Sequence, residues 1–225
     1  LHLNSSSRED TSMKKIAVLT ALLFAALQIG YAQKVGLVLS GGGAKGAAHI
    51  GVIKALEENG IPIDYITGTS AGAIVGSLYA MGYTPEEMVE LMLSEEFSYW
   101  QTGTVENEYK YYFKRPDPTP EFGHFSIDMT DSLQVKASFL PQSLINPIQM
   151  NQAFMALFSQ ATAKAGWNFD NLFVPFRCVA SDIYSKKAII FKNGDLGDAV
   201  RASMTFPFFF QPIWKDSVPI FDGGI

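Results

Sequence analysis

The chain has 225 residues, enough for one domain with a substantial buried core. Hydrophobic residues make up 48% of the chain and charged residues 17%, which indicates a globular rather than a disordered protein. The net charge of -5 argues against a nucleic-acid partner, because nucleic-acid-binding proteins normally present a basic face. The same charge is compatible with a lipid or a small neutral substrate.

The N-terminal part of the chain is typical of an export leader. Met13 is followed by two lysines, then by an apolar run that ends in the small residues read by a signal peptidase. The run is shorter than the roughly 20 residues that span a bilayer, although a buried helix or a short anchor is an alternative. We predict upstream read-through over residues 1–12, a signal peptide over residues 13–32 and a catalytic domain over residues 33–225. Export would take the protein to the periplasm, the outer membrane or the cell surface.

Strands and helices alternate after the leader. Residues 34–40 are apolar and rich in valine and leucine, which predicts a buried strand. Residues 47–60 carry apolar side chains at helical spacing and end in glycine, which predicts a helix. Residues 63–68 predict a second strand. Residues 71–82 predict a helix with side chains small enough to pack close to a sheet.

The second half of the chain continues this alternation. Thr84, Pro85 and Glu87 form a capping box that begins a helix through about Leu93, and residues 146–164 predict another helix. The segments FRCVASDI and KAIIF predict paired strands, GDLGDAVRAS a short helix, and VPIFDGG a last strand entering a glycine turn. This order predicts an α/β sandwich with a largely parallel sheet.

Residues 97–145 are rich in aromatic side chains without a clear period. We interpret them as an irregular segment packed on its own aromatic residues. A lid or an interfacial surface is the alternative, because tyrosine and tryptophan suit a membrane boundary. The aromatic residues are Phe97, Tyr99, Trp100, Tyr109, Tyr111, Tyr112, Phe113, Phe122 and Phe125.

The segment GTSAG matches the pattern G-x-S-x-G between a predicted strand and a predicted helix. A serine on such a sharp turn presents its hydroxyl at the edge of the sheet, while Gly68 and Gly72 leave room for the turn and for close packing. The following helix directs its positive N-terminus at the same place. The pattern therefore predicts Ser70 as a nucleophile.

A histidine or a carboxylate could serve as the base that deprotonates Ser70. His49 lies on the helix after a glycine loop and is interpreted as a packing or capping residue. No histidine follows His124, so the chain order serine, acid, histidine of an ordinary triad is poorly supported. Asp222 ends a predicted strand and enters a glycine turn, where its carboxylate could deprotonate Ser70 directly. A plain turn signal is the alternative interpretation of the DGG segment.

The glycine loop SGGGAKG admits two interpretations. Its spacing fits the dinucleotide fingerprint, and its backbone could also stabilise negative charge during a reaction. A dinucleotide site needs an acidic residue about 20 positions further on, at the end of the next strand. Residues 66–68 occupy that place, and Asp64 comes at the start of the strand. These positions weaken the dinucleotide interpretation.

Taken together, the segments GGGAKGAAHIGVIKALEE, ITGTSAGAIVGSLYA and GDLGDAVRASMTFPFFFQP resemble the bacterial, secreted branch of the patatin-like phospholipase family. The resemblance covers nearly all of residues 34–224 apart from the aromatic middle. It implies a three-layer α/β sandwich with a mostly parallel central sheet flanked by helices. It also implies a catalytic dyad of Ser70 and Asp222.

The resemblance further implies an oxyanion hole and a set of supporting residues. The oxyanion hole would be formed by backbone N–H groups of Gly41, Gly42 and Gly43. The family usually has arginine where this chain has Lys45, and lysine keeps the positive charge but loses the planar fork of donors. The other supporting residues are Gly46, Gly68, Gly72, Gly223 and Gly224.

The expected function is hydrolysis of the acyl esters of phospholipids or lysophospholipids at a membrane surface. We expect no cofactor, and no metal because no His, Cys, Asp and Glu grouping has ligand spacing. Cys178 lies in an apolar strand-like segment and is expected to be inert. The chain ends directly after the DGG segment, so we expect a truncation after residue 225. Secreted members can carry a C-terminal outer-membrane barrel, which could be the missing part. The alternatives are an inactive surface or scaffold protein and a dinucleotide-binding module.

Overall fold

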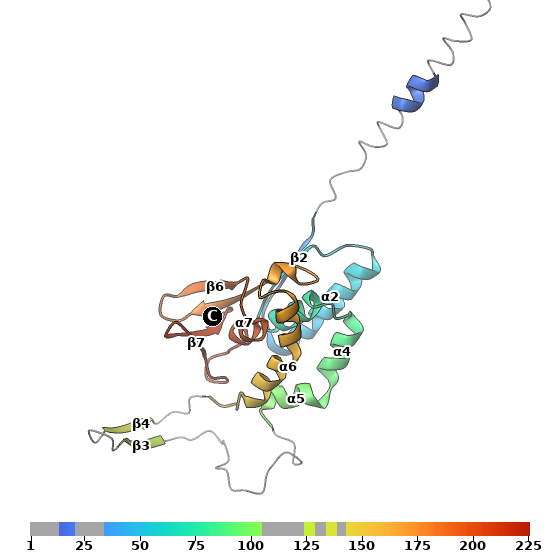
Figure 1. Ribbon diagram of the computed structural model, residues 1–225. Helices are drawn as coiled ribbons and strands as arrows, with labels where there is room; N and C mark the ends of the chain where they lie inside the picture. Colours follow the sequence, from blue (N-terminus) through green and yellow to red (C-terminus); the bar gives the residue numbers. More distant parts are fainter. Residues whose placement is uncertain (1–13, 21–33, 105–123, 129–133, 139–142) are drawn as a thin grey trace, which may run out of the picture. The chain divides into compact units, whose positions relative to one another are not determined.

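The computed structural model describes the chain in five stretches (Figure 1), which are residues 14–20, 34–104, 124–128, 134–138 and 143–225. Leu1–Lys34 and Val35–Ile225 are separate units, and each is described by itself.

The first unit contains a short helix over residues 14–20, on which Ile16, Val18 and Leu19 are exposed. Within the described stretches of the chain, no helix is both long enough and apolar enough to cross a membrane. The rest of the predicted leader lies outside the described residues, so the signal peptide and the upstream read-through stay predictions.

The second unit is built on a six-stranded sheet with a parallel and an antiparallel part. Strands β1 (Gly36–Leu39), β2 (Tyr65–Thr69) and β5 (Phe176–Asp182) are parallel neighbours in this order. Strand β6 (Lys187–Phe191) pairs antiparallel with β5, which confirms the predicted pairing of these two segments. Strand β8 (Val218–Asp222) also pairs antiparallel with β5, and β7 (Ile213–Lys215) pairs with β8.

Strands β2 and β8 share one edge of β5. Thr69, the last residue of β2, pairs with Val179, and Asp222, the last residue of β8, pairs with Ala180. Strand β6 pairs with β5 across both positions and therefore occupies the opposite edge. The C-terminal ends of β2 and β8 thus approach each other from opposite directions and meet at neighbouring residues of β5.

The helices of this unit form an inner layer that contacts the sheet and an outer layer that packs on the inner helices (Figure 1). Helices α3 (Ala71–Ala80) and α7 (Leu196–Ser203) contact the strands directly. Helix α2 (Ala47–Glu58) packs on α3 and α4 (Pro85–Leu93), and α6 (Ile148–Lys164) packs on α7. This arrangement confirms the predicted α/β fold with a central sheet and flanking helices. The remaining elements are η1 (Gly43–Gly46), α5 (Glu95–Thr102), η3 (Phe169–Asn171) and the hairpin of β3 (His124–Asp128) and β4 (Gln134–Ser138).

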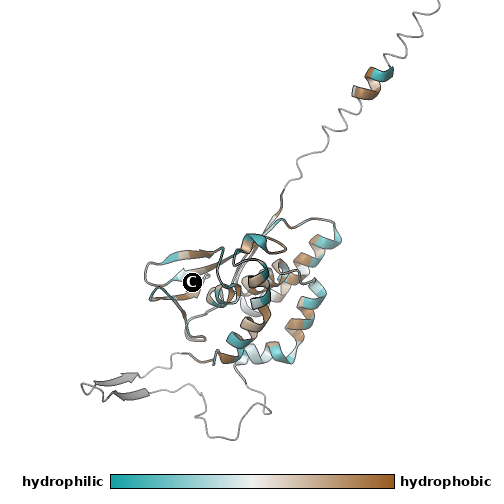
Figure 2. Cartoon of the chain, in the orientation of Figure 1, coloured by the Kyte–Doolittle hydropathy of each residue, from teal (hydrophilic) through white to brown (hydrophobic). Residues whose placement is uncertain are grey.

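The core lies between the sheet and its helices. Along β5 the side chains alternate, so that Phe176, Cys178 and Ala180 are buried on the face covered by α3 and α7. Helix α3 is hydrophobic almost all round and is buried along most of its length, as its small residues predict. The outer helices carry both hydrophobic and hydrophilic residues (Figure 2). Burying a large apolar side chain contributes about 1.5–3 kcal/mol.

The capping box predicted for α4 is confirmed. The Thr84 hydroxyl accepts a hydrogen bond from the Glu87 N–H at 3.2 Å, and the Glu87 carboxylate accepts one from the Thr84 N–H at 2.8 Å. The Thr84 N–H and the Thr84 hydroxyl both donate to the Glu87 carboxylate, which holds the pKa of Glu87 below its usual value. Lys54 of α2 donates to the exposed Glu86 of α4 at 2.7 Å, which lowers the pKa of Glu86. Such a surface pair adds little to stability.

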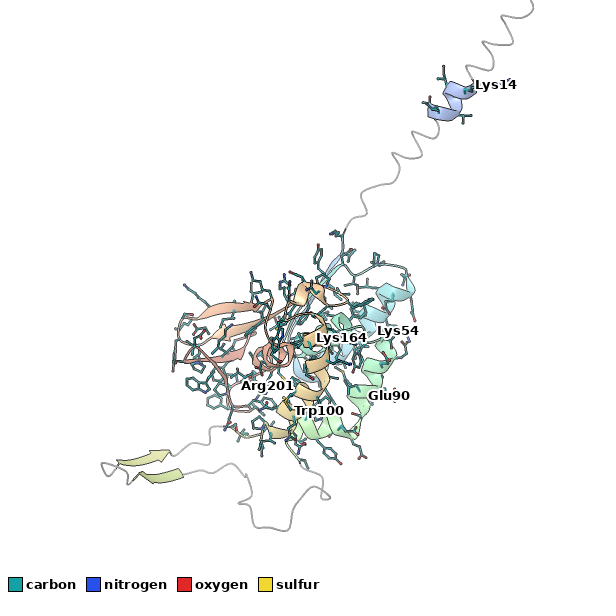
Figure 3. All side chains as sticks on the ribbon, in the orientation of Figure 1. Lys14, Lys54, Glu90, Trp100, Lys164 and Arg201 are labelled. Carbon is teal, nitrogen blue, oxygen red and sulfur yellow. The ribbon has the colours of Figure 1, made fainter. Side chains whose placement is uncertain are left out.

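The aromatic segment that begins at Phe97 does not follow an irregular course at its start. Phe97 and Trp100 lie on α5, and the Trp100 ring packs edge-on against Phe154 of α6 with 6.4 Å between the ring centroids. Trp100 is labelled in Figure 3. The aromatic residues from Tyr109 to Phe122 lie outside the described residues.

Candidate active site

A cavity of about 990 Å³ opens where β2 and β8 meet. One part of its wall contains Ser70, Asp222 and the glycine loop. Of the described residues that line it, Gln101 contributes the only other polar side chain. The apolar lining consists mainly of Ile74, Met92, Leu93, Phe97, Trp100, Ile145, Met150, Phe154, Met204, Phe206, Phe209 and Phe210. A mostly apolar cavity with a few convergent polar groups is the usual form of a small-molecule site.

Ser70 stands on the turn between β2 and α3 in a strained backbone conformation. Its φ is 56° and its ψ is -123°, a combination that costs a residue with a side chain about 1–3 kcal/mol. Strain of this kind is expected for a serine on a sharp strand-to-helix turn. The surrounding structure must therefore hold the residue in place.

Gly68 and Gly72 let the turn pack against its neighbours. A Cβ added to Gly72 would collide with the carbonyl group of Leu39 and lie 2.7 Å from the Ser40 oxygen. A Cβ added to Gly68 would lie 2.6 Å from the Ala73 nitrogen. Both glycines are therefore required by close backbone approach, as the sequence predicts.

Ser203, at the end of α7, holds the backbone of Ser70. The Ser203 hydroxyl accepts a hydrogen bond from the Ser70 N–H at 3.0 Å and donates one to the Val179 carbonyl at 2.5 Å. Its side chain is fully buried. Sequence reasoning missed this residue, although Arg201, Ser203 and Thr205 are spaced polar residues in an otherwise apolar segment.

The same end of α7 also positions Asp222. The Asp222 N–H donates to the Thr205 carbonyl at 2.8 Å, and the Gly223 N–H donates to the Ser203 carbonyl at 3.4 Å. The Asp222 side chain is buried, and its carboxylate accepts a hydrogen bond from the Gly224 N–H at 2.7 Å. The segment after α7 therefore connects the strand end that carries Asp222 with the turn that carries Ser70.

The glycine loop forms the wall of the cavity next to Ser70. Gly41, Gly42, Gly43 and Gly46 all line the cavity, and η1 begins at Gly43. The first N–H groups of a helix have no partner within the helix, so this loop offers donors to an anion. The side chain of His49 lies 2.9 Å from the Ser40 carbonyl and supports the start of the loop, as a packing or capping residue would.

Lys45, a predicted supporting residue, and Asp64, the acidic residue weighed for a dinucleotide site, are not among the residues that line the cavity. Lys45 is exposed. The carboxylate of Asp64 accepts a hydrogen bond from the Val35 N–H at 2.7 Å at the start of the sheet. Within the described part of the chain, no group of three His, Cys, Asp or Glu side chains could hold a metal ion.

The geometry suits acyl transfer at Ser70. A hydroxyl, a carboxylate and a row of backbone donors meet in one cavity, and the N-terminus of α3 adds a positive end beside the hydroxyl. Over residues 37–225 the sequence matches the family model described as patatin-like phospholipase. The chain belongs to the patatin-like phospholipase family.

Known relatives of this patatin-like domain are much longer proteins. It is 29% identical over 192 residues to patatin-like phospholipase domain-containing protein ZK370.4 of Caenorhabditis elegans, a match that covers 84% of this chain and 12% of the relative. It is 31% identical over 193 residues to lysophospholipase NTE1 of Pyricularia oryzae, covering 85% of this chain and 10% of that protein. These relatives are eukaryotic, so they do not support the predicted bacterial, secreted branch.

A solved structure shares the patatin-like fold described here. VipD from Legionella pneumophila aligns with a TM-score of 0.53 at 16% sequence identity, and the match covers 85% of this chain and 46% of VipD. At this level of identity the likeness shows the fold alone.

Arg201 braces the wall of the patatin-like cavity. Its guanidinium donates to Asn151 at 3.0 Å, to Thr205 at 2.6 Å and to the Gln211 carbonyl at 3.2 Å, and lies over the Phe210 ring at 5.1 Å. Burial lowers the pKa of Arg201 to about 10. The buried guanidinium thus links α6, α7 and the following loop through hydrogen bonds to uncharged acceptors.

Proposed function

We propose that this chain hydrolyses long-chain acyl esters of phospholipids or lysophospholipids, with Ser70 as nucleophile and Asp222 as base. The observation that carries the proposal is the cavity in which these two polar residues adjoin an extensive apolar wall. A fatty acyl chain is the ligand that such a wall accommodates, because it buries apolar surface without needing polar partners. The family and the lysophospholipase name of the fungal relative support a lipid substrate.

The first step is acylation of Ser70. The Ser70 hydroxyl oxygen attacks the ester carbonyl carbon while its proton passes to the Asp222 carboxylate. The carbonyl oxygen becomes an oxyanion, which the N–H groups of Gly42 and Gly43 stabilise. One such donor is typically worth about 2.7–4 kcal/mol. The tetrahedral intermediate then collapses, and the leaving alcohol or lysolipid takes the proton from Asp222.

The second step releases the fatty acid. A water molecule attacks the acyl-Ser70 carbonyl and gives its proton to Asp222. The same loop stabilises the second oxyanion, and collapse of this intermediate breaks the bond to the Ser70 oxygen. That oxygen recovers the proton from Asp222, and the site returns to its starting state.

The test is fatty acid release from a monomeric p-nitrophenyl butyrate and from phosphatidylcholine vesicles. We expect Ser70→Ala and Asp222→Asn each to reduce hydrolysis by at least about 10³-fold, because each removes a group needed in both steps. Asn is nearly isosteric with Asp and keeps an acceptor for the Gly224 N–H. Thermal unfolding should therefore stay close to that of the unmodified protein.

Ser77→Ala is the matched control. Ser77 is a fully buried serine on α3 whose hydroxyl donates to the Ile74 carbonyl, and it does not line the cavity. This variant should retain hydrolysis. If Asp222→Asn retained most of the activity, the dyad proposal would be wrong and another base would have to be sought.

We also propose that residues 13–32 direct export of the protein. The two lysines after Met13, the apolar run and the small residues that follow support this proposal. Fusing residues 1–34 to a reporter enzyme that is active only after export would test it. Replacing Lys14 and Lys15 by glutamate should reduce export of the reporter.

A further inference from the structure

Four large exposed apolar side chains are here called the rim: Leu93, Phe206 and Phe209, which line the cavity, and Phe208, which lies between two of them in the sequence. The exposed fraction is 81% for Leu93, 50% for Phe206, 75% for Phe208 and 45% for Phe209. Leu93, Phe206 and Phe209 also line the cavity, so these side chains lie where the cavity meets solvent. The rim therefore continues the apolar wall of the cavity outward onto the surface.

The backbone beneath the rim is firmly held. The Phe208 carbonyl accepts a hydrogen bond from Leu144 at 2.8 Å, and the Phe209 carbonyl accepts one from Ile145 at 2.9 Å. The Arg201 side chain bonds the Gln211 carbonyl at the far end of the same loop. The three phenylalanines of the rim are thus presented by an ordered loop, which reduces the entropy that binding would cost.

Phe208 occupies a strained position. Its φ is 69°, in the left-handed region that a bulky residue rarely adopts, and its ring is three-quarters exposed. Neither the backbone strain nor the exposed ring favours the isolated fold. Strain retained around an exposed aromatic side chain points to a role outside the fold itself.

The charge around the rim argues for a neutral apolar partner. Between Arg201 and Lys215 the sequence ASMTFPFFFQPIW contains no ionisable side chain, and the ionisable residues that follow Leu93 most closely are the exposed carboxylates Glu95 and Glu96. Attraction to anionic headgroups needs clustered lysine and arginine. Insertion of aromatic and aliphatic side chains into the interfacial layer needs no charge.

We propose that the rim inserts into the surface of a zwitterionic lipid layer and places the mouth of the cavity against it. An acyl chain can then pass from the lipid layer to the cavity wall along Phe206 and Phe209 without crossing water. The continuity between rim and cavity favours a lipid surface over a protein partner. This inference rests on the proposed function, because it takes the cavity to be the acyl site.

Phe208→Ser tests the rim, with Phe173→Ser as the matched control. Phe173 is 74% exposed but belongs neither to the rim nor to the cavity lining. We expect the protein to float with phosphatidylcholine vesicles in a density gradient. Phe208→Ser should lower the vesicle-bound partition by about tenfold, since it removes one inserted aromatic side chain. Phe173→Ser should bind like the unmodified protein.

Hydrolysis assays separate this inference from the proposed function. Phe208→Ser should lose vesicle hydrolysis but keep hydrolysis of monomeric p-nitrophenyl butyrate, because Phe208 does not line the cavity. If no variant and no unmodified protein cleaved the monomeric ester, the proposed function would fail, while flotation of Ser70→Ala would still test the rim.

Three results would overturn the inference. One is unchanged flotation of Phe208→Ser. Another is binding that requires phosphatidylserine and disappears at high salt. The third is a dimer in solution that Phe208→Ser dissociates while vesicle binding stays unchanged, which would make a second copy of the chain the occupant of the rim.

Discussion

The N–H of Ser70 already has a partner before any substrate arrives. Because Ser203 accepts this hydrogen bond, the strained backbone of Ser70 is held by a group from another element. The donors available to an oxyanion must then come from the glycine loop and from the start of α3. At this scale the position of the Ser70 hydroxyl depends on the hydroxyl of Ser203.

Ser203→Ala should impair catalysis without unfolding the protein. The variant leaves the part-buried Ser70 N–H and the Val179 carbonyl without their partner, which we expect to lower the free energy of unfolding by about 1–3 kcal/mol. Hydrolysis of the monomeric ester should show a fall in kcat with a smaller change in KM, because the apolar wall is intact.

Ser77→Ala is again the comparison, since it also removes a fully buried serine hydroxyl. If the role of Ser203 were merely structural, Ser203→Ala would lose more stability than Ser77→Ala, because only Ser203→Ala leaves a backbone N–H without its partner, but the two variants would have the same kcat. Equal kcat values, together with equal rates of Ser70 labelling by a fluorophosphonate, would contradict the positioning role.

At the scale of elements, η1 and α2 can pack closely against the start of α3 because Gly46 has no side chain. A Cβ added to Gly46 would lie 2.5 Å from the Ala71 Cβ, and the backbone of Gly46 is otherwise in the ordinary helical region. The obstacle to a side chain here is therefore steric contact rather than backbone conformation.

Gly46→Ala and Gly51→Ala should shift stability in opposite directions. Overpacking at Gly46 should cost about 1–3 kcal/mol and reduce hydrolysis, because Ala71 follows Ser70. Gly51 lies within α2 with open space around it, so alanine there should stabilise the protein by about 0.5–1 kcal/mol. Urea unfolding would measure both effects. A destabilised Gly51→Ala variant would contradict this account.

Elements with strong local signals were predictable from the sequence, whereas others were not. The capping box located α4, and the apolar period located α2. Helix α5 has local signals too, because Ser94 caps it and Gly103 ends it with a φ of 69°, but its aromatic residues obscured the helical period. Strand β7 is three residues long and pairs with β8, so no local pattern identifies it.

Some residues of the candidate site were likewise predictable from the sequence, and others were not. The motifs identified Ser70, Asp222 and the glycine loop, and these residues line one cavity. Their chemical roles stay predictions until the variants are measured. Ser203 was not predictable, because its hydrogen-bond partners are distant from it in the sequence. They are Ser70, on the turn after β2, and Val179, on β5.

At the scale of the whole molecule, the single thiol reports on the integrity of the core. Cys178 is the one cysteine of the chain, it is fully buried between the sheet and its helices, and burial raises the pKa of its thiol. A buried neutral thiol is a poor nucleophile. Its accessibility therefore depends on opening of the central strand β5.

Cys178 should react with a disulfide reagent such as dithionitrobenzoate only when the protein opens. We expect no measurable labelling of the folded protein over minutes and complete labelling in urea. The labelling rate below the unfolding transition should rise for Gly46→Ala and fall for Gly51→Ala. Rapid labelling of the folded protein would show that the sheet is not closed over this residue.

The meeting of β2 and β8 on β5 sets the order in which the two residues of the proposed dyad come together. The turn with Ser70 leaves the ribosome early, whereas Asp222 belongs to the last strand of the described domain and joins it only after β5 is in place. A chain synthesised only as far as β5 would therefore hold the proposed nucleophile without its proposed base. Hydrolysis by the proposed dyad would begin only when β8 docks on β5.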